Sequence, residues 1–395
     1  MVPEIRKKYN AEFTEEKYQA FLSDLNAYLG IPIEFRVAET PIFIGREFKD
    51  EILKAVDEIT SYLMSDEYKK LSMNAIPEGL EVPNDPGYTA MLAIDFAICK
   101  DENGKFIPKL IELQGFSSLF FYELLQNHMY RKHFSINERY GGLFNIHKPD
   151  EYLDILKQVV VGDKNPENVI LLEIEPEKQK TRIDFECCKK FIGVKPVCLT
   201  KVIKEGKDLF YDNDGKKTKI ERIYNRVIFD ELERRKDLKF NFSFQDELNV
   251  EWLPHPNWFY RISKYSLPFL KNKYVPETNF LSDIDSYPDD LENYVLKPLF
   301  SFAGVGVVFD VTKEILDKIE DPTNYILQRK INYEPVIETP DTPAKAELRL
   351  LFVHKDGKPY LVNNLVRLSK GKMMGVDFNK EKTWVGSSLA YFEHL

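Results

Sequence analysis

The 395-residue sequence has few of the side chains that build metal or nucleophilic centres, with four cysteines and six histidines. Four cysteines in a chain of this length are too few for a disulfide framework, so we expect reduced thiols. Cys187 and Cys188 are adjacent in a predicted helix and point to different faces, which excludes a C-x-x-C metal pair. The histidines show neither H-x-x-x-H nor H-E-x-x-H spacing. We therefore expect neither a zinc site nor a histidine-based catalytic triad.

An excess of positive charge is also absent, because 64 Asp and Glu outnumber 55 Lys and Arg to give a formal net charge of -9, and the lysines and arginines are dispersed. This balance argues against a general nucleic-acid binder, although it does not exclude a local basic groove. Residues 1–18 are charged and lack the apolar run of a signal peptide, and no stretch reaches the length of a membrane span. We expect a cytoplasmic protein with neither nucleic acid nor a membrane as a partner.

Two common nucleotide-binding motifs are missing, since no G-x-G-x-x-G turn and no Walker A loop occurs. What is present is the stretch 294–310, YVLKPLFSFAGVGVVFD, which predicts a β-hairpin with Lys297 at its mouth and Gly304 and Gly306 in its loop. Such a lysine presents a compact charge to a phosphate, and glycines let backbone N–H groups approach it. An ordinary hairpin with a solvated lysine fits the same residues.

The composition, with 43% hydrophobic and 13% aromatic residues, allows a sizeable core and predicts two or three lobes. Helical spacing of apolar residues over 13–29 and 49–64 predicts a mainly helical segment over residues 1–85.

Residues 151–260 predict an α/β unit. Buried strands are expected at 168–174 and 194–200, with an amphipathic helix at 178–191 between them. The unit has the pattern of half a doubly wound sheet. Without a glycine-rich turn, however, it does not predict a dinucleotide site.

Oxygen ligands gather on a second predicted hairpin, at residues 91–98 and 106–114. The first strand carries Asp95, and the return strand carries Glu112 and Gln114 two residues apart, which places their side chains on one face. Carboxylate and amide oxygens beside one another suit Mg²⁺ together with phosphate oxygens. The alternative is that Glu112 and Gln114 lie on the solvated face of an edge hairpin.

Four polar residues are candidates for substrate contacts. Ser117 and Ser118 follow the hairpin at the start of a predicted helix, where hydroxyl and N–H groups can meet an anion. Asn225 and Arg226 interrupt the apolar segment IERIYNRVIF. They either face a cleft from a strand end or are ordinary loop residues.

The last third of the chain carries further cationic motifs. Lys264 stands at a predicted helix start, and residues 325–331, YILQRKI, form a predicted strand. In ELRLLFV the alternation puts Glu347 and Arg349 on one face, and Arg367 precedes a glycine-flanked basic loop.

Taken in order, these segments resemble an ATP-grasp domain. The resemblance lies in Ser263 and Lys264, in VLKPLFSFAGVGVV, in YILQRKI, in ELRLLF and in LVNNLVRLSKGKMMG. It implies an α+β or α/β fold in which two antiparallel lobes hold ATP. Because the metal-ligand hairpin precedes the other motifs, and PKLIELQGFSS is similar to a Glu-x-Asn motif, the chain resembles the circularly permuted branch. That branch includes glutathionylspermidine synthetase and eukaryotic glutathione synthetase.

The resemblance implies a role for each matching residue. ATP would contact Lys264, Lys297, Gly304, Gly306 and the hinge residues Gln328, Arg329, Lys330 and Ile331. Mg²⁺ would be held by Asp95, Glu112 and Gln114, and the transferred phosphoryl group would be stabilised by Lys297, Arg349 and Arg367. The substrate would contact Ser117, Ser118, Asn225 and Arg226. The implied domains are a helical segment (1–85), the metal-ligand hairpin with its following helices (86–150), the α/β domain (151–260) and the ATP-binding lobes (261–395).

Three departures from the family pattern concern the metal and the substrate. Gln114 stands where permuted relatives have asparagine, Ser301 where glutathione synthetase has an acid, and Ala93 where glutathionylspermidine synthetase has an arginine. The resemblance implies a carboxylate–amine ligase that works through an acyl-phosphate on small-molecule or peptide substrates. The alternatives are an ATP-dependent phosphotransferase and a degenerate nucleotide-binding scaffold protein.

Overall fold

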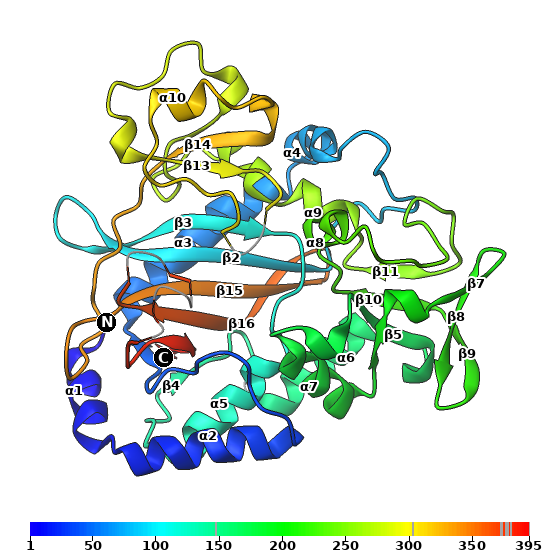
Figure 1. The fold of residues 1–395 in the computed structure, drawn as a ribbon. Coiled ribbons are helices and arrows are strands. Elements are labelled where there is room, and N and C mark those ends of the chain that lie inside the picture. Colours follow the sequence, from blue (N-terminus) through cyan, green and yellow to red (C-terminus); the bar gives the residue numbers. More distant parts are fainter. Residues whose placement is uncertain (147, 302–303, 372–373, 376–378, 380, 395) are drawn as a thin grey trace.

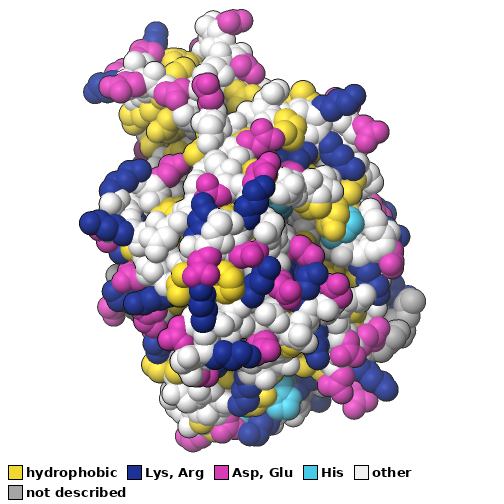
Figure 2. All heavy atoms as spheres, turned by 90° about the vertical axis from the view of Figure 1, so that its right-hand side faces the viewer, with side chains coloured by type: hydrophobic (Ala, Val, Ile, Leu, Met, Phe, Trp, Pro, Cys, Tyr) yellow, Lys and Arg dark blue, Asp and Glu magenta, His cyan; other side chains and the backbone are white. Residues whose placement is uncertain are grey.

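The computed structural model describes residues 1–395 except 147, 302–303, 372–373, 376–378, 380 and 395. Within the described residues the chain forms a mixed α/β structure with five sheets (Figure 1). On the face drawn in Figure 2, basic and acidic side chains are intermixed over the surface. No helix in the described part of the chain is both long and apolar enough to cross a membrane.

A five-stranded antiparallel sheet crosses the middle of the molecule (Figure 1). Its strands, in order across the sheet, are β17 (Gly386–Ser388), β16 (Lys358–Ser369), β15 (Lys345–Lys355), β2 (Met91–Lys100) and β3 (Phe106–Gln114). The sheet thus joins the predicted metal-ligand hairpin to strands more than 200 residues further along the chain. The predicted domain boundaries stay predictions, and this sheet is shared between two of the predicted segments.

The two faces of this sheet differ, because successive side chains along a strand point to opposite sides. Leu348 and Leu350 share one apolar cluster with Ile52 and Ile59 of helix α3 (Arg46–Leu63). The neighbouring odd-numbered positions therefore face the other way.

On that other face, the strand register brings charged residues together. Asp95 of β2 lies opposite Glu112 of β3 on one side and opposite Arg349 of β15 on the other. Glu347 of β15 lies opposite Arg367 of β16. The expectation that the hairpin places Asp95 beside Glu112 is confirmed.

The predicted α/β unit is confirmed as a four-stranded parallel sheet. Its order is β11 (Glu251–Leu253), β10 (Arg222–Asn225), β5 (Val169–Glu173) and β6 (Lys195–Cys198). Helix α7 (Arg182–Ile192) connects β5 to β6, and it begins four residues later than the apolar pattern predicts. An antiparallel meander of β7 (Ile203–Glu205), β8 (Asp208–Asn213) and β9 (Lys216–Ile220) extends from this unit (Figure 1).

A small antiparallel sheet forms a separate lobe at the top of Figure 1. Its order is β12 (Thr278–Phe280), β14 (Tyr325–Arg329) and β13 (Tyr294–Pro298), with helix α10 (Lys313–Leu316) beside it. The predicted hairpin is confirmed at one position, but its second strand is not. Leu296 and Val308 exchange both backbone hydrogen bonds after the glycine turn, whereas residues 307–309 form no strand in the described part of the chain, and the full partner of β13 is β14.

The remaining elements tie the two ends of the chain together. β1 (Ile42–Ile44) pairs in parallel with β18 (Ala390–Glu393), which also pairs with β4 (Tyr140–Gly141). The other helices are α1 (Pro3–Glu12), α2 (Glu15–Leu29), α4 (Asp66–Leu71), α5 (Tyr122–His133), α6 (Pro149–Val160), α8 (Phe229–Arg234) and α9 (Asn257–Arg261). The 3₁₀ helices are Ser72–Ala75, Pro166–Asn168, Pro176–Lys178, Leu199–Lys201, Lys264–Phe269, Leu281–Asp283, Leu291–Asn293 and Pro322–Asn324.

Candidate active site

Buried carboxylates hold a pair of arginines on the charged face of the central sheet. Arg349 contacts Asp95 at two points, with Nε donating to Oδ1 over 2.7 Å and Nη2 to Oδ2 over 2.6 Å. Arg367 Nη2 lies 3.2 Å from the same Oδ2 and also donates to Glu347. Asp95 and Glu347 are only 1% and 3% exposed, so their charges need these cations. The two predicted catalytic arginines are thus brought together and fixed in place.

Glu347 and Tyr333 complete this group, although the motifs do not identify either as a site residue. The Tyr333 hydroxyl donates to Glu347 Oε2 over 2.8 Å, and burial, reinforced by Glu347, raises the pKa of Tyr333 well above its ordinary value. Burial alone would lower the pKa of Arg367, but the carboxylates of Glu347, Asp95 and Glu112 raise it overall. The alternation in ELRLLF is the sequence signal for Glu347, whereas Tyr333 has none.

A second pair of cations, Lys264 and Lys297, lies near Glu112. Lys264 opens a 3₁₀ helix capped by the Ser263 side chain, and its Nζ lies 3.6 Å from Glu112 Oε1. Lys264 Nζ also donates to the backbone oxygen of Ser301. Burial lowers the pKa of Lys297 to about 8; Glu112 opposes this shift, and the positive charge of Lys264 adds to it.

The lysine pair fits a phosphate chain. Of the two cations, only Lys264 has a carboxylate, that of Glu112, within ion-pair distance among the residues that the structure describes. The Ser301 hydroxyl is buried without a hydrogen-bond partner among the same residues. A polyanion would favour the charged form of Lys297 and could accept from Ser301. The predicted ATP role of Lys264 and Lys297 stays a prediction, supported by this geometry.

The predicted adenine hinge supports the lysine pair through one side chain. Gln328 is 1% exposed, accepts from Lys297 Nζ over 2.6 Å and donates to Thr278 over 2.9 Å. Lys330 Nζ instead donates to a backbone oxygen, that of Glu292. Of the other hinge residues, Arg329 pairs with Asp290. Ile331 packs against the apolar cluster that contains Leu348 and Leu350 of the central sheet.

The predicted glycine loop contains a turn at residues 304–306. Gly304 and Gly306 have φ values of 76° and 73°, a region that side chains with a Cβ avoid. A Cβ on Gly306 would also lie 2.8 Å from Pro298 Cγ. Residues 302–303 of this loop lie outside the described residues.

The predicted magnesium ligands lie side by side, but one of them is already engaged. Both oxygens of Asp95 accept hydrogen bonds from Arg349, which leaves Glu112 and the 7%-exposed Gln114 as oxygen donors. In the described part of the chain no group of three or more His, Cys, Asp or Glu side chains could hold a metal ion. Magnesium binding stays a prediction that needs phosphate oxygens to complete the ligand set.

The predicted substrate residues connect the two large sheets. Ser118 Oγ accepts from Arg349 Nη1 over 2.8 Å, and Ser117 Oγ accepts from Arg226 Nη1 over 3.2 Å. Asn225 Nδ2 and Arg226 Nε are buried and find no hydrogen-bond partner among the described residues. Ser118 therefore lies with the arginine pair, while Asn225 and Arg226 lie at the end of the parallel sheet.

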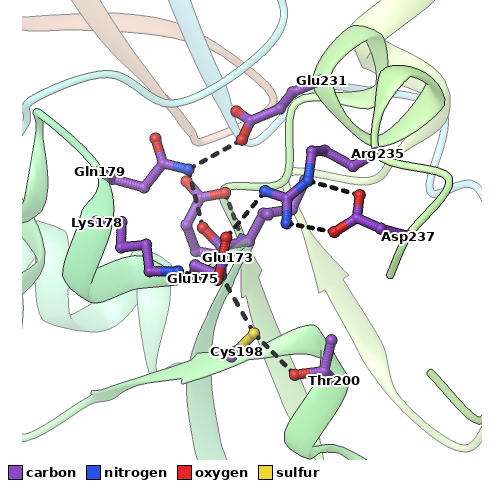
Figure 3. A network of polar contacts seen from close by, with 10 residues as sticks. Glu173, Glu175, Lys178, Gln179, Cys198, Thr200, Glu231, Arg235 and Asp237 are labelled. Atoms are coloured by element: carbon purple, nitrogen blue, oxygen red, sulfur yellow. Dashed lines mark hydrogen bonds and ion pairs between the residues drawn. The ribbon is translucent and has the colours of Figure 1, made fainter. Parts of the chain in front are cut away.

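A polar network that the motifs do not single out occupies the same end of the parallel sheet (Figure 3). Glu173 ends β5, is 2% exposed and has a pKa raised to about 8 by burial, which Arg226 partly offsets. Beside it, Arg235 Nη1 pairs with Glu175 Oε2 over 2.9 Å, and the Glu175 backbone N–H donates to Cys198 Sγ (Figure 3). Ligands of α/β proteins bind at the carboxyl ends of parallel strands, and the acid at the end of NVILLEI is the sequence signal.

A cavity of about 620 Å³ opens beside the arginine pair. Its lining includes three of the predicted site residues, Ser118, Arg349 and Arg367. It also includes side chains of α2 and of the segment that follows it, which no motif connects with the site.

The described residues thus form a mixed α/β fold around the central antiparallel sheet. No protein-family model matches the sequence, and no curated protein matches it either. A solved structure does match: the glutathione synthetase-like effector GSS30 from Globodera pallida, in its apo form. The similarity covers 96% of this chain and 96% of that chain, with a TM-score of 0.56 and 11% sequence identity. At this identity the similarity shows the fold alone.

Proposed function

We propose that the protein is an ATP-dependent ligase that joins a carboxylate to an amine through an acyl-phosphate. One observation carries the proposal: two lysines with few counter-charges lie on the same side of the central sheet as two arginines fixed by acids. The similarity to a glutathione synthetase-like effector supports it. The circularly permuted ATP-grasp arrangement is part of the same proposal.

In this proposal the lysine pair binds the phosphates of ATP. Lys264 and Lys297 supply positive charge, and the positive-φ turn at Gly304 and Gly306 brings backbone N–H groups close to them. Gln328 positions Lys297 by accepting from its ammonium group. Magnesium bound through Glu112 and Gln114 would neutralise phosphate charge and orient the phosphate oxygens.

The arginine pair acts on the carboxylate substrate. That carboxylate would receive the γ-phosphoryl group, releasing ADP, and the amine of the second substrate would then displace phosphate and lose a proton. Arg349, oriented by Asp95 and Ser118, and Arg367, held by Glu347, stabilise the negative charge that develops. Positioning and electrostatics suffice, and no side chain has to form a covalent intermediate.

A nucleotide-binding protein without catalysis is the second candidate. Asp95, a predicted metal ligand, is bound by Arg349, and Ser301 replaces an acid of the resembled family. A phosphotransferase would use the same lysines and arginines but release the phosphorylated carboxylate without an amine.

Calorimetric titration with ATP, with and without magnesium, tests the proposal. We expect magnesium-dependent binding in the wild type, strong weakening in Lys297→Met, and no change in Lys313→Met, which removes an exposed lysine of the same lobe. Phosphate release is then screened over pairs of carboxylates and amines. Binding without phosphate release from any pair would favour the non-catalytic candidate. Equal binding by wild type and Lys297→Met would refute the lysine site.

A further inference from the structure

The cavity beside the arginine pair has mostly hydrocarbon walls. Leu22 lies on α2, Ile33 and Phe35 follow that helix, and Leu365 and Leu368 lie on β16. A wall of this kind stabilises apolar surface by removing it from water.

All charges in this lining are positive. Arg36, Arg349 and Arg367 line the cavity, and no Asp, Glu or Lys does so among the residues described. The acids that pair with these arginines, Glu39 with Arg36 and Asp95 with Arg349, are 3% and 1% exposed and do not line it. The carboxylates therefore hold the arginines from behind, and the cavity meets the guanidinium groups.

Two of the residues that line the cavity carry polar atoms without a hydrogen-bond partner among the described residues. Arg367 Nε and Ser387 Oγ are buried without a hydrogen-bond partner in the described part of the chain. The two residues are opposite each other on β16 and β17, and both line the cavity. Buried polar atoms left unpaired are costly, so this wall suits a ligand that brings acceptor oxygens.

We propose that this cavity selects a substrate that combines an anionic group, such as a carboxylate, with an apolar body. The anionic group is recognised by Arg367 and its neighbours, and the apolar body by Leu22, Ile33 and Phe35. The inference rests on the proposed ligase function, of which it names one substrate class. A volume of about 620 Å³ holds a ligand well beyond a small amino acid, and the guanidinium groups that line it offer donors to an anion but no acceptor to a polyamine.

Three probes separate charge from apolar body without ATP: octanoate, octylamine and acetate, titrated calorimetrically into the full chain. We expect octanoate to bind at least about tenfold more tightly than acetate, which lacks the apolar body, and than octylamine, which reverses the charge. Octylamine binding as tightly as octanoate, or acetate doing so, would overturn the inference. The absence of octanoate binding would overturn it as well.

A matched pair of variants locates the binding. Leu22→Asn places an amide in the apolar wall and is expected to weaken octanoate binding by about tenfold. Ser23→Asn changes the adjacent, exposed position of the same helix, which does not line the cavity, and is expected to leave binding intact. Equal effects would place octanoate elsewhere and overturn the inference. Leu22→Met, which conserves volume, reports on folding because it should retain binding.

The same titration distinguishes this inference from the proposed function. Octanoate binding should persist in Lys297→Met, whereas ATP binding should not. If ATP binds and octanoate does not, the cavity assignment alone fails. If octanoate binds and ATP does not, the ligase proposal fails while the cavity remains a site for apolar anions.

Discussion

The lysine pair and the arginine pair are two cationic groups on one side of the central sheet, and they differ in how their charge is balanced. Arg349 and Arg367 are bonded to buried carboxylates, and the pKa of Arg367 is raised. Lys297 has no carboxylate within ion-pair distance in the described part of the chain, donates only to a neutral amide, and has a pKa lowered to about 8.

This difference separates cations that buried carboxylates already balance from a cation that no carboxylate pairs with among the described residues. Removing a carboxylate from the arginine pair should leave a buried cation unpaired and destabilise the protein. Removing the charge of Lys297 should relieve a desolvation penalty and impair only the binding of an anion. Each of the following predictions tests one side of this contrast.

The largest expected effect is on the arginine side. Asp95→Ala leaves the buried guanidinium of Arg349 without its two-point partner, so we expect the free energy of unfolding to fall by about 3 to 5 kcal/mol. Urea denaturation measures this loss. Glu102→Ala, at an exposed turn position of the same hairpin, should unfold at the wild-type urea concentration. An Asp95→Ala midpoint equal to that of Glu102→Ala would show that Asp95 does not hold the arginines.

The next largest effect is a pH dependence of ATP affinity that arises from Lys297. Lys297 is charged below its pKa of about 8 and neutral above it, so ATP affinity should fall as the pH rises through 8, by at most about tenfold per pH unit. Calorimetry above neutral pH, where phosphate groups are already ionised, measures this decline. Lys297→Arg, which keeps its charge, should remove the decline. A wild-type profile as flat as that of Lys297→Arg would contradict the lowered pKa.

The smallest expected effect is on the free energy of unfolding of Lys297→Met, the variant that loses the lysine charge. Lys297→Met keeps most of the side-chain volume and removes a half-buried cation, while it also breaks one hydrogen bond to Gln328. These changes oppose each other, so the free energy of unfolding should change by less than about 1 kcal/mol. The same denaturation experiment as for Asp95→Ala gives the comparison. A loss comparable to that of Asp95→Ala would mean that Lys297 supports the fold as the arginines do.

The local sequence pattern was sufficient to predict elements whose site residues lie within one strand or one hairpin. The apolar runs MLAIDFAI and FIPKLIELQ, joined by a turn with Asn103 and Gly104, predict the β2–β3 hairpin and the common face of Asp95 and Glu112, and the register confirms this. Likewise, the strand-and-helix pattern predicts the parallel sheet, and the two positive-φ glycines match the expected turn.

Local pattern failed where distant segments meet. β1 and β18 have three and four residues, too short for a period to emerge, yet they pair across the length of the chain. Tyr333 reaches Glu347 from a segment without regular structure. The sequence does not predict the part of the cavity wall that α2 forms either. The pattern of an amphipathic helix shows which face is buried but not which segment packs against that face.

The pairing of β2 with β15 also bears on how the chain reaches its native state. The two strands are about 250 positions apart, as the contact between Asp95 and Arg349 shows, so no local event during synthesis can bring them together. Until β15 has emerged from the ribosome, the β2–β3 hairpin presents an open edge and an uncompensated acid. Closing so long a loop is slow, and such edges invite association between nascent chains. The charged face is therefore assembled late in folding, and a nascent chain that stalls before residue 345 should be a substrate for chaperones.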